Sequence, residues 1–99
     1  MPTFITYYKL TDQGIRNIRE APKRIETGIK AFEAAGGKII GFYATMGEHD
    51  YVAISEAPEE LGAAFTLAQG ALGNVRTTTV RAFSVEEFGE LISKLPPAQ

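Results

Sequence analysis

Two strand-like runs stand back to back at the centre of this 99-residue sequence. Residues 38–46 (KIIGFYATM) and 50–56 (DYVAISE) are rich in β-branched and aromatic residues, and only Gly47, Glu48 and His49 separate them. This spacing predicts a β-hairpin. Because consecutive elements of a small domain usually lie side by side, a central hairpin leaves few ways for the flanking segments to complete the sheet and to cover it.

The flanking segments predict two more strands. Residues 3–10 (TFITYYKL) and 75–83 (VRTTTVRAF) have the β-branched and aromatic composition of strands. Between the first strand and the hairpin, apolar residues recur at helical spacings, with a break at Pro22 and a stop at Gly36-Gly37. A helix is therefore expected between the first strand and the hairpin.

Two more helices are predicted in the second half of the chain. Pro58-Glu59-Glu60 has the proline and the acidic residues typical of a helix start, and Gly73-Asn74 marks the end of that helix. After the last strand, Ser84 and Glu87 form a capping-box pattern ahead of a third helix, which Pro96-Pro97 ends.

The predicted order is β-α-β-β-α-β with a C-terminal helix. This order matches the split βαβ, ferredoxin-like arrangement, an α+β fold with a four-stranded antiparallel sheet. Right-handed crossovers place both crossover helices on one face of the sheet and leave the other face bare. A chain of this length forms one domain, residues 1–99.

The length of the hairpin loop decides which side chains share a face of the sheet. A three-residue loop, Gly47 to His49, separates the apolar residues best and predicts that Tyr43 and Tyr51 lie on the helix-free face; a two-residue loop would put Tyr51 in the core. Strand alternation adds Arg81 to the same face. We expect this face to pack against a second copy, around a cleft that suits a small anionic or aromatic ligand.

The loop itself carries the only histidine of the chain. Neighbouring strand residues point to opposite faces, so His49 and Asp50 are not expected to form a catalytic dyad. We expect Asp50 and Gly47 to be turn residues, and His49 to lie at the rim of the cleft as a hydrogen-bond donor to the ligand. One histidine and no cysteine predict neither a metal site nor a cofactor.

Three stretches together resemble a known family. MPTFITYYKLTDQGIRNI, the hairpin GFYATMGEHDYVAI and LGNVRTTTVRAF are similar to the GYD-domain family of small bacterial proteins, and the similarity runs from Pro2 to about Leu95. Gly47 and Asp50 match its Gly-Tyr-Asp signature, while His49 stands where the family usually has tyrosine. The resemblance implies a ferredoxin-like fold related in shape to dimeric α/β-barrel proteins, and it implies no established reaction.

The composition argues against two classes of function, nucleic-acid binding and membrane spanning. A net charge of −2 and a pI near 5.4 argue against nucleic-acid binding, and no apolar run approaches the roughly 20 residues of a membrane span. The N-terminus lacks a signal-peptide pattern, so a cytoplasmic location is expected. The favoured function is a homo-oligomeric binding or accessory module for a small ligand.

Two alternatives remain open. One is a cofactor-independent enzyme, tautomerase-like or monooxygenase-like, with a cleft between subunits. In the tautomerase version Pro2, freed of Met1, would act as a base, and Arg76 or Arg81 would hold a substrate carboxylate. The other is an assembly protein whose exposed sheet serves only to associate.

Overall fold

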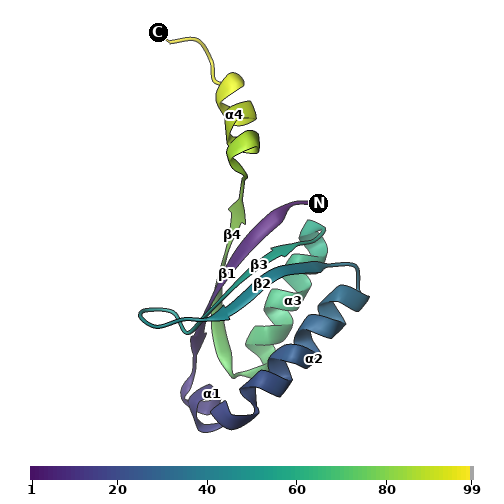
Figure 1. The fold of residues 1–99 in the computed structure, drawn as a ribbon, viewed down its shortest axis with the longest axis vertical. Helices are drawn as coiled ribbons and strands as arrows, with labels where there is room; N and C mark the ends of the chain where they lie inside the picture. Colours follow the sequence, from purple (N-terminus) through teal and green to yellow (C-terminus); the bar gives the residue numbers. More distant parts are fainter. Residues whose placement is uncertain (99) are drawn as a thin grey trace.

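The structure, a computed structural model, describes residues 1–98 (Figure 1). Its elements in chain order are β1 (Thr3–Leu10), α1 (Asp12–Arg16), a short 3₁₀ helix (Ile18–Glu20), α2 (Ala21–Ala34), β2 (Lys38–Ala44), β3 (Tyr51–Glu56), α3 (Glu59–Leu72), β4 (Val75–Ala82) and α4 (Val85–Ser93). The four strands are antiparallel in the order β2-β3-β1-β4. The predicted α+β class is confirmed, and the strand order is consistent with a ferredoxin-like arrangement.

The helices begin and end where the sequence provides capping residues. Pro22 lies in the first turn of α2, and the left-handed residues Gly36 and Gly73 follow α2 and α3 with φ of 107° and 85°. At the start of α4, the side chain of Ser84 accepts a hydrogen bond from the Glu87 amide, and the Glu87 carboxylate accepts one from the Ser84 amide.

The start of α1 is held tightly against the turn between α3 and β4. The Thr11 amide donates to the Asn74 carbonyl at 3.0 Å, and the Thr11 hydroxyl donates to the Gly73 carbonyl at 2.6 Å. Gly14 is buried in this contact, and a β-carbon at that position would overlap the Asn74 carbonyl oxygen. Only glycine fits there without a shift of the backbone.

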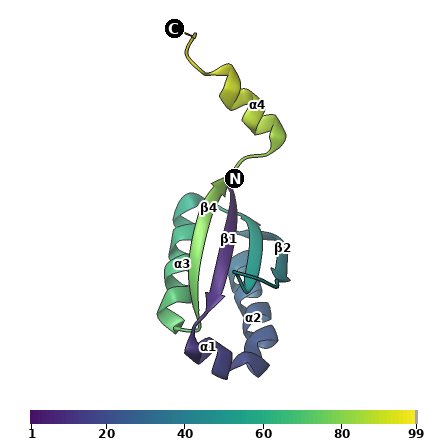
Figure 2. The same ribbon diagram turned by 90° about the vertical axis from the view of Figure 1, so that its left-hand side faces the viewer.

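The two crossover helices cover the same face of the sheet, as predicted. Helix α2 lies over β2 and α3 lies over β4, with the central strands β1 and β3 between them (Figure 2). Helix α4 does not join this layer and projects away from the body, which gives the molecule an extent of 55 Å along its longest axis (Figures 1 and 2). Over residues 1–98, no helix combines the length and the apolar character needed to cross a bilayer.

The hairpin forms, but its predicted three-residue loop length is wrong. Ala44 pairs with Tyr51, and the Thr45 amide donates to the Asp50 carbonyl at 2.8 Å, so an even number of residues, not three, separates the paired positions. A β-bulge at Ile40 adds one residue to β2. The even loop reverses the faces of β3 and turns Tyr51 toward the helices, where only 8% of it is exposed.

The faces of β4 are also the reverse of the prediction. Thr77 and Thr79 point to the helix side, together with Ala53 and Ser55 of β3. In β3 the bulkier apolar residues Val52 and Ile54 occupy the helix-free side, whereas in β1 Phe4, Tyr8 and Leu10 point to the helix side. The floor below the helices therefore combines small and hydroxyl-bearing side chains from β3 and β4 with larger apolar ones from β1.

Candidate functional site

The helix-free side of the sheet, here called the open face, is an apolar surface. Strand register places its residues in two rows, one formed by Val80, Ile5 and Ile54 and the other by Thr78, Tyr7, Val52 and Tyr43. Val80 and Tyr43 are 42% and 58% exposed. The Tyr43 ring lies over Gly41, where a β-carbon would come within 2.8 Å of it. A contiguous surface of this kind typically marks an interaction site.

The three residues predicted to share one cleft are separated. Tyr43 lies on the open face as expected, but Tyr51 is buried on the helix side. Arg81 lies near the end of β4, where its guanidinium donates to the carbonyls of Thr3 and Ala82 and stacks on the Phe83 ring, 4.4 Å from its centroid. The three side chains therefore do not line one cleft: the wrong loop length misplaced Tyr51, and Arg81 lies at the end of β4, away from Tyr43.

His49 lies in a shallow hollow on the open face. The hollow has a volume of about 250 Å³, and its lining includes Tyr7, Lys9 and Arg76. The imidazole packs on the Tyr7 ring with 4.8 Å between centroids. The Lys9 ammonium donates to the Glu48 carbonyl at 2.9 Å. Sequence reasoning did not connect Lys9 or Tyr7 with the loop, because the contact depends on the pairing of β1 with β3.

Asp50 ties the hairpin to the central strand. Its carboxylate accepts a hydrogen bond from the Leu10 amide at 2.7 Å, and its own amide donates to the Tyr8 carbonyl at 2.8 Å. Gly47, with φ of 121°, lies in the left-handed region that favours glycine. Both signature positions thus shape the backbone of the loop and its attachment to β1.

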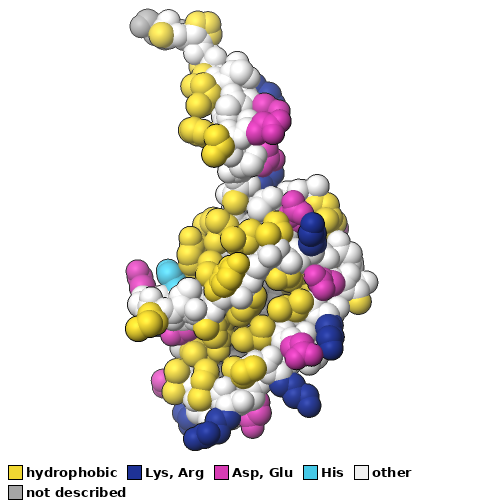
Figure 3. Space-filling view, viewed as in Figure 1, with side chains coloured by type: hydrophobic (Ala, Val, Ile, Leu, Met, Phe, Trp, Pro, Cys, Tyr) yellow, Lys and Arg dark blue, Asp and Glu magenta, His cyan; other side chains and the backbone are white. Residues whose placement is uncertain are grey.

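A large hollow, here called the helix-side groove, lies between the sheet and helices α2 and α3. Its volume is about 920 Å³, and apolar side chains surround it (Figure 3). Phe32 and Phe65 meet edge to face at 5.1 Å between centroids, where α2 and α3 come together. Away from that contact the space between the helices and the sheet is unfilled, above small side chains such as Ala53 and Thr79.

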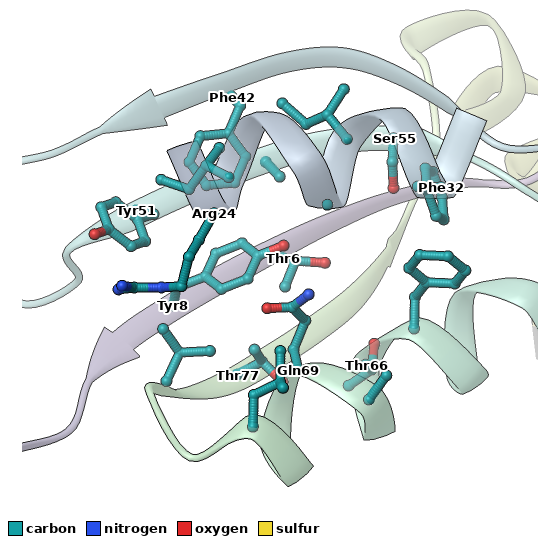
Figure 4. Close-up of a pocket in the computed structure, with 18 of the residues that line it drawn as sticks. Thr6, Tyr8, Arg24, Phe32, Phe42, Tyr51, Ser55, Thr66, Gln69 and Thr77 are labelled. Carbon is teal, nitrogen blue, oxygen red and sulfur yellow. The ribbon is translucent and has the colours of Figure 1, made fainter. Parts of the chain in front are cut away.

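Three aromatic rings line the groove at the end away from Phe32. Tyr8, Phe42 and Tyr51 lie 5.5–6.0 Å apart between centroids, and the Arg24 side chain reaches the same end (Figure 4). The Tyr51 hydroxyl is buried and has no hydrogen-bond partner among residues 1–98. Burial raises its pKa, the positive charge of Arg24 acts in the opposite direction, and burial also raises the pKa of Tyr8.

The approach of Arg24 to the same end of the groove as Tyr51 was missed from the sequence. The signal was present in β3, where alanine and serine alternate with valine and isoleucine. The apolar positions were assigned to the core, whereas they lie on the open face. Both faces of the sheet are compatible with burial, so alternation alone did not identify the face that the helices cover.

Helix α4 carries a second unpartnered apolar surface. Its apolar residues are all exposed, by 42–89%: Val85, Phe88, Leu91, Ile92 and Leu95 just beyond its end. Figure 3 shows hydrophobic side chains along one side of this helix and acidic side chains along the other. The predicted amphipathic pattern is present, but no surface of the body covers it.

Comparison with known proteins identifies a family and a solved structure that this chain resembles. The family model of the GYD domain matches residues 4–92. A protein of Thermus thermophilus named glutamine synthetase and cystathionine beta-lyase binding protein is 34% identical over 101 residues, which cover 96% of this chain and 99% of that protein. The crystal structure of TTHA0845 from Thermus thermophilus superposes with a TM-score of 0.51 at 20% identity, over 86% of this chain and 96% of the other. That structural likeness supports the fold alone.

Proposed function

This chain belongs to the GYD domain family, and from that premise we propose that it is a homo-oligomeric accessory module that acts by binding other proteins. The open face carries the proposal. Its central residues Ile5, Val52 and Ile54 are apolar and lie on the two middle strands, with no helix above them. Association of two such faces in a dimeric barrel-like arrangement would remove this surface from water.

The role proposed for the oligomer follows that of the Thermus relative. That protein is named for binding glutamine synthetase and cystathionine beta-lyase, and it matches this chain over nearly its whole length. We extend to this chain a role of the same kind, in which the assembled oligomer binds a metabolic enzyme such as glutamine synthetase. The assembly presents several copies of one surface, and multiple copies raise the avidity for a partner that carries more than one binding site.

A small anionic or aromatic ligand belongs to the same proposal, at a corrected position. The hollow around His49 contains the Tyr7 ring for stacking and the cations of Lys9 and Arg76 for an anionic group. Tyr43 lies on the same face. In this proposal Arg76 binds the anionic group, the role that the sequence analysis assigned to Arg81. A second sheet packed on the open face would close the hollow.

The test of self-association is the molar mass in solution. Size-exclusion chromatography with light scattering at micromolar concentration should give at least two copies for the parent and a smaller mass for Ile54→Glu, because a carboxylate cannot be buried unpaired in the interface. Met46→Glu is the matched control, since Met46 is fully exposed at the hairpin tip. A parent that is monomeric at all concentrations, or an Ile54→Glu variant with the mass of the parent, would contradict the proposal.

Enzyme binding is measured separately. Purified glutamine synthetase from the same organism should bind to the immobilised parent and to Met46→Glu, and bind more weakly to Ile54→Glu as avidity falls. Equal binding to all three would show that the oligomer plays no part, and no binding to the parent would exclude this enzyme as the partner.

A further inference from the structure

The helix-side groove and helix α4 are two separate defects in the packing of one chain. Among residues 1–98 the buried apolar residues are few for a domain of this size and mostly small: Ala21, Phe32, Tyr51, Ala53, Ala57 and Val75. Protein interiors are normally packed as densely as organic crystals, so an unfilled volume of about 920 Å³ is unusual. At the same time, α4 has an apolar side and nothing to pack on. The chain thus lacks a filling for its core and a surface for its last helix.

We propose that α4 of one copy packs into the helix-side groove of a second copy, and that the exchange is reciprocal. One contact removes both defects, because the groove needs an apolar filling and α4 needs an apolar cover. An amphipathic helix in an apolar groove is a recurring mode of recognition. Exchange of an identical element between protomers is also a low-cost route to a dimer.

The dimensions of the two partners agree. Helices α2 and α3, which form the walls of the groove, each have 14 residues, and α4 has nine. At 1.5 Å per residue the walls are about 21 Å long and α4 is about 14 Å long, so the helix fits within the groove. An isolated helix as short as α4 is marginal in water, so its stability depends on packing.

The charges are compatible with this arrangement. The side of α4 away from its apolar residues carries Glu86 and Glu90, and the wall of the groove formed by α2 carries Lys23 and Arg24. Seating the apolar side of α4 in the groove therefore leaves both carboxylates in solvent, so no charge of the helix is buried unpaired. Two acidic residues, Glu20 and Glu59, also line the groove and balance its basic pair.

The connection between β4 and α4 favours the second copy over the same chain. Only Phe83 and Ser84 join the two elements. Arg81 stacks on Phe83 and donates to the Thr3 carbonyl, and the capping box holds Ser84 in an extended conformation. To fold back onto its own groove, α4 would have to reverse direction within these two residues and break those contacts.

The buried area is large enough for a stable dimer. Apolar side chains of this size bury roughly 60–120 Å² each, so the five on α4 and the matching groove surface, counted for both copies, give roughly 1,200–2,400 Å². Specific protein interfaces bury about 1,200–2,000 Å². The proposal goes beyond the association of open faces, because it uses the opposite side of the molecule.

The absence of tryptophan from the chain makes a fluorescence test possible. Phe88→Trp places one indole on the apolar side of α4, and the experiment is run in the Ile54→Glu background so that the open faces do not contribute. The emission should be shifted to the blue at high protein concentration and move to the red on dilution, together with a fall in molar mass from dimer to monomer. Adding Leu91→Glu should weaken the association at least ~30-fold, as expected for a central interface residue.

Two glycine variants provide a matched pair. Gly28 lies in α2 and lines the groove, and a β-carbon there would meet only the Gln69 amide nitrogen at 3.8 Å. Gly28→Leu should fill the groove and abolish the blue shift without unfolding the chain. Gly70 lies on α3 in open space and outside the groove lining, so Gly70→Leu should leave the shift intact.

The remaining outcomes would overturn the proposal. A blue-shifted monomer that does not respond to dilution would show that α4 packs on its own chain. Emission of an exposed indole at every concentration, or equal behaviour of Gly28→Leu and Gly70→Leu, would show that the groove does not receive α4. If the parent is a dimer and Ile54→Glu is a monomer, the parent associates through the open face alone. That result would refute the packing of α4 into the groove.

Discussion

Asp50 provides the most direct test of how the hairpin is attached to the sheet. Its carboxylate accepts the Leu10 amide at 2.7 Å in a partly buried position. A hydrogen bond to a charged group contributes about 1.5–3 kcal/mol, and Asp50→Ala leaves the amide without this acceptor. Because water reaches a partly buried amide, we expect a loss of about 1.5–2 kcal/mol in the free energy of unfolding. For a domain of this size that corresponds to a fall in Tm of roughly 6–16 °C.

Urea denaturation followed by circular dichroism measures this loss, with an unchanged m value as the sign that both end states are the same. Asp50→Asn retains a carbonyl acceptor without the charge and should lose less than half as much. Glu48→Ala is the matched control in the same loop, because the observed contact of Glu48 uses only its backbone carbonyl, and its effect should be within about 0.5 kcal/mol. If Asp50→Ala is as mild as Glu48→Ala, or Asp50→Asn as severe as Asp50→Ala, the carboxylate does not act through the Leu10 amide.

Three further predictions concern single positions. His49→Tyr keeps a ring in the open-face hollow and should change the free energy of unfolding by no more than about 1 kcal/mol, and metal analysis of untagged parent protein should find no stoichiometric transition metal; a loss of several kcal/mol would refute the first part. Gly14→Ala should destabilise by about 1–3 kcal/mol in denaturation experiments because its β-carbon overlaps the Asn74 carbonyl, whereas Gly70→Ala, with open space around it, should stabilise by about 0.4–1 kcal/mol. The hydrogen bond from the N-cap backbone amide lowers the pKa of Glu87, so its contribution to α4 is complete above the ordinary value of 4.5 and is lost as the pH falls through the lowered pKa; helicity measured by circular dichroism should fall over that range in the parent and not in Glu87→Gln.

The order of the elements was predictable because each carries a local signal. The capping box at Ser84, the proline at the start of α2 and the glycine after α3 all act within a few residues of the helix end that they define. Such signals do not depend on tertiary contacts. Because these local signals gave the order of helices and strands, they also identified the fold class.

The faces of the β2–β3 hairpin were not predictable, because they depend on two single-residue features. The paired ends of the hairpin, Thr45 and Asp50, enclose an even loop, and Ile40 forms a bulge that shifts the register of β2. Either feature exchanges the two faces of a strand. If the open face were polar, the sequence would have shown which side of β3 faces solvent. Val52 and Ile54 on the open face are instead as apolar as core residues.

The candidate site was therefore only partly accessible from the sequence. His49 was expected at the rim of a ligand site and lies in a hollow, but its neighbours Tyr7 and Lys9 come from β1, some 40 residues away in the chain. The helix-side groove depends on how far α2 and α3 stand apart, and no local pattern encodes that separation.

The strand order has a consequence for folding of the chain during its synthesis on the ribosome. Strand β1 is made first and lies between β3 and β4, so it gains its second neighbour only when the last strand has been made. At about 5–20 residues per second, synthesis from Ala57 to Ala82 takes roughly 1–5 s. During that interval an eight-residue strand edge is open to any other extended segment nearby. Neighbouring ribosomes on one message hold several such chains at once, so the first encounter between two copies can precede the completion of either.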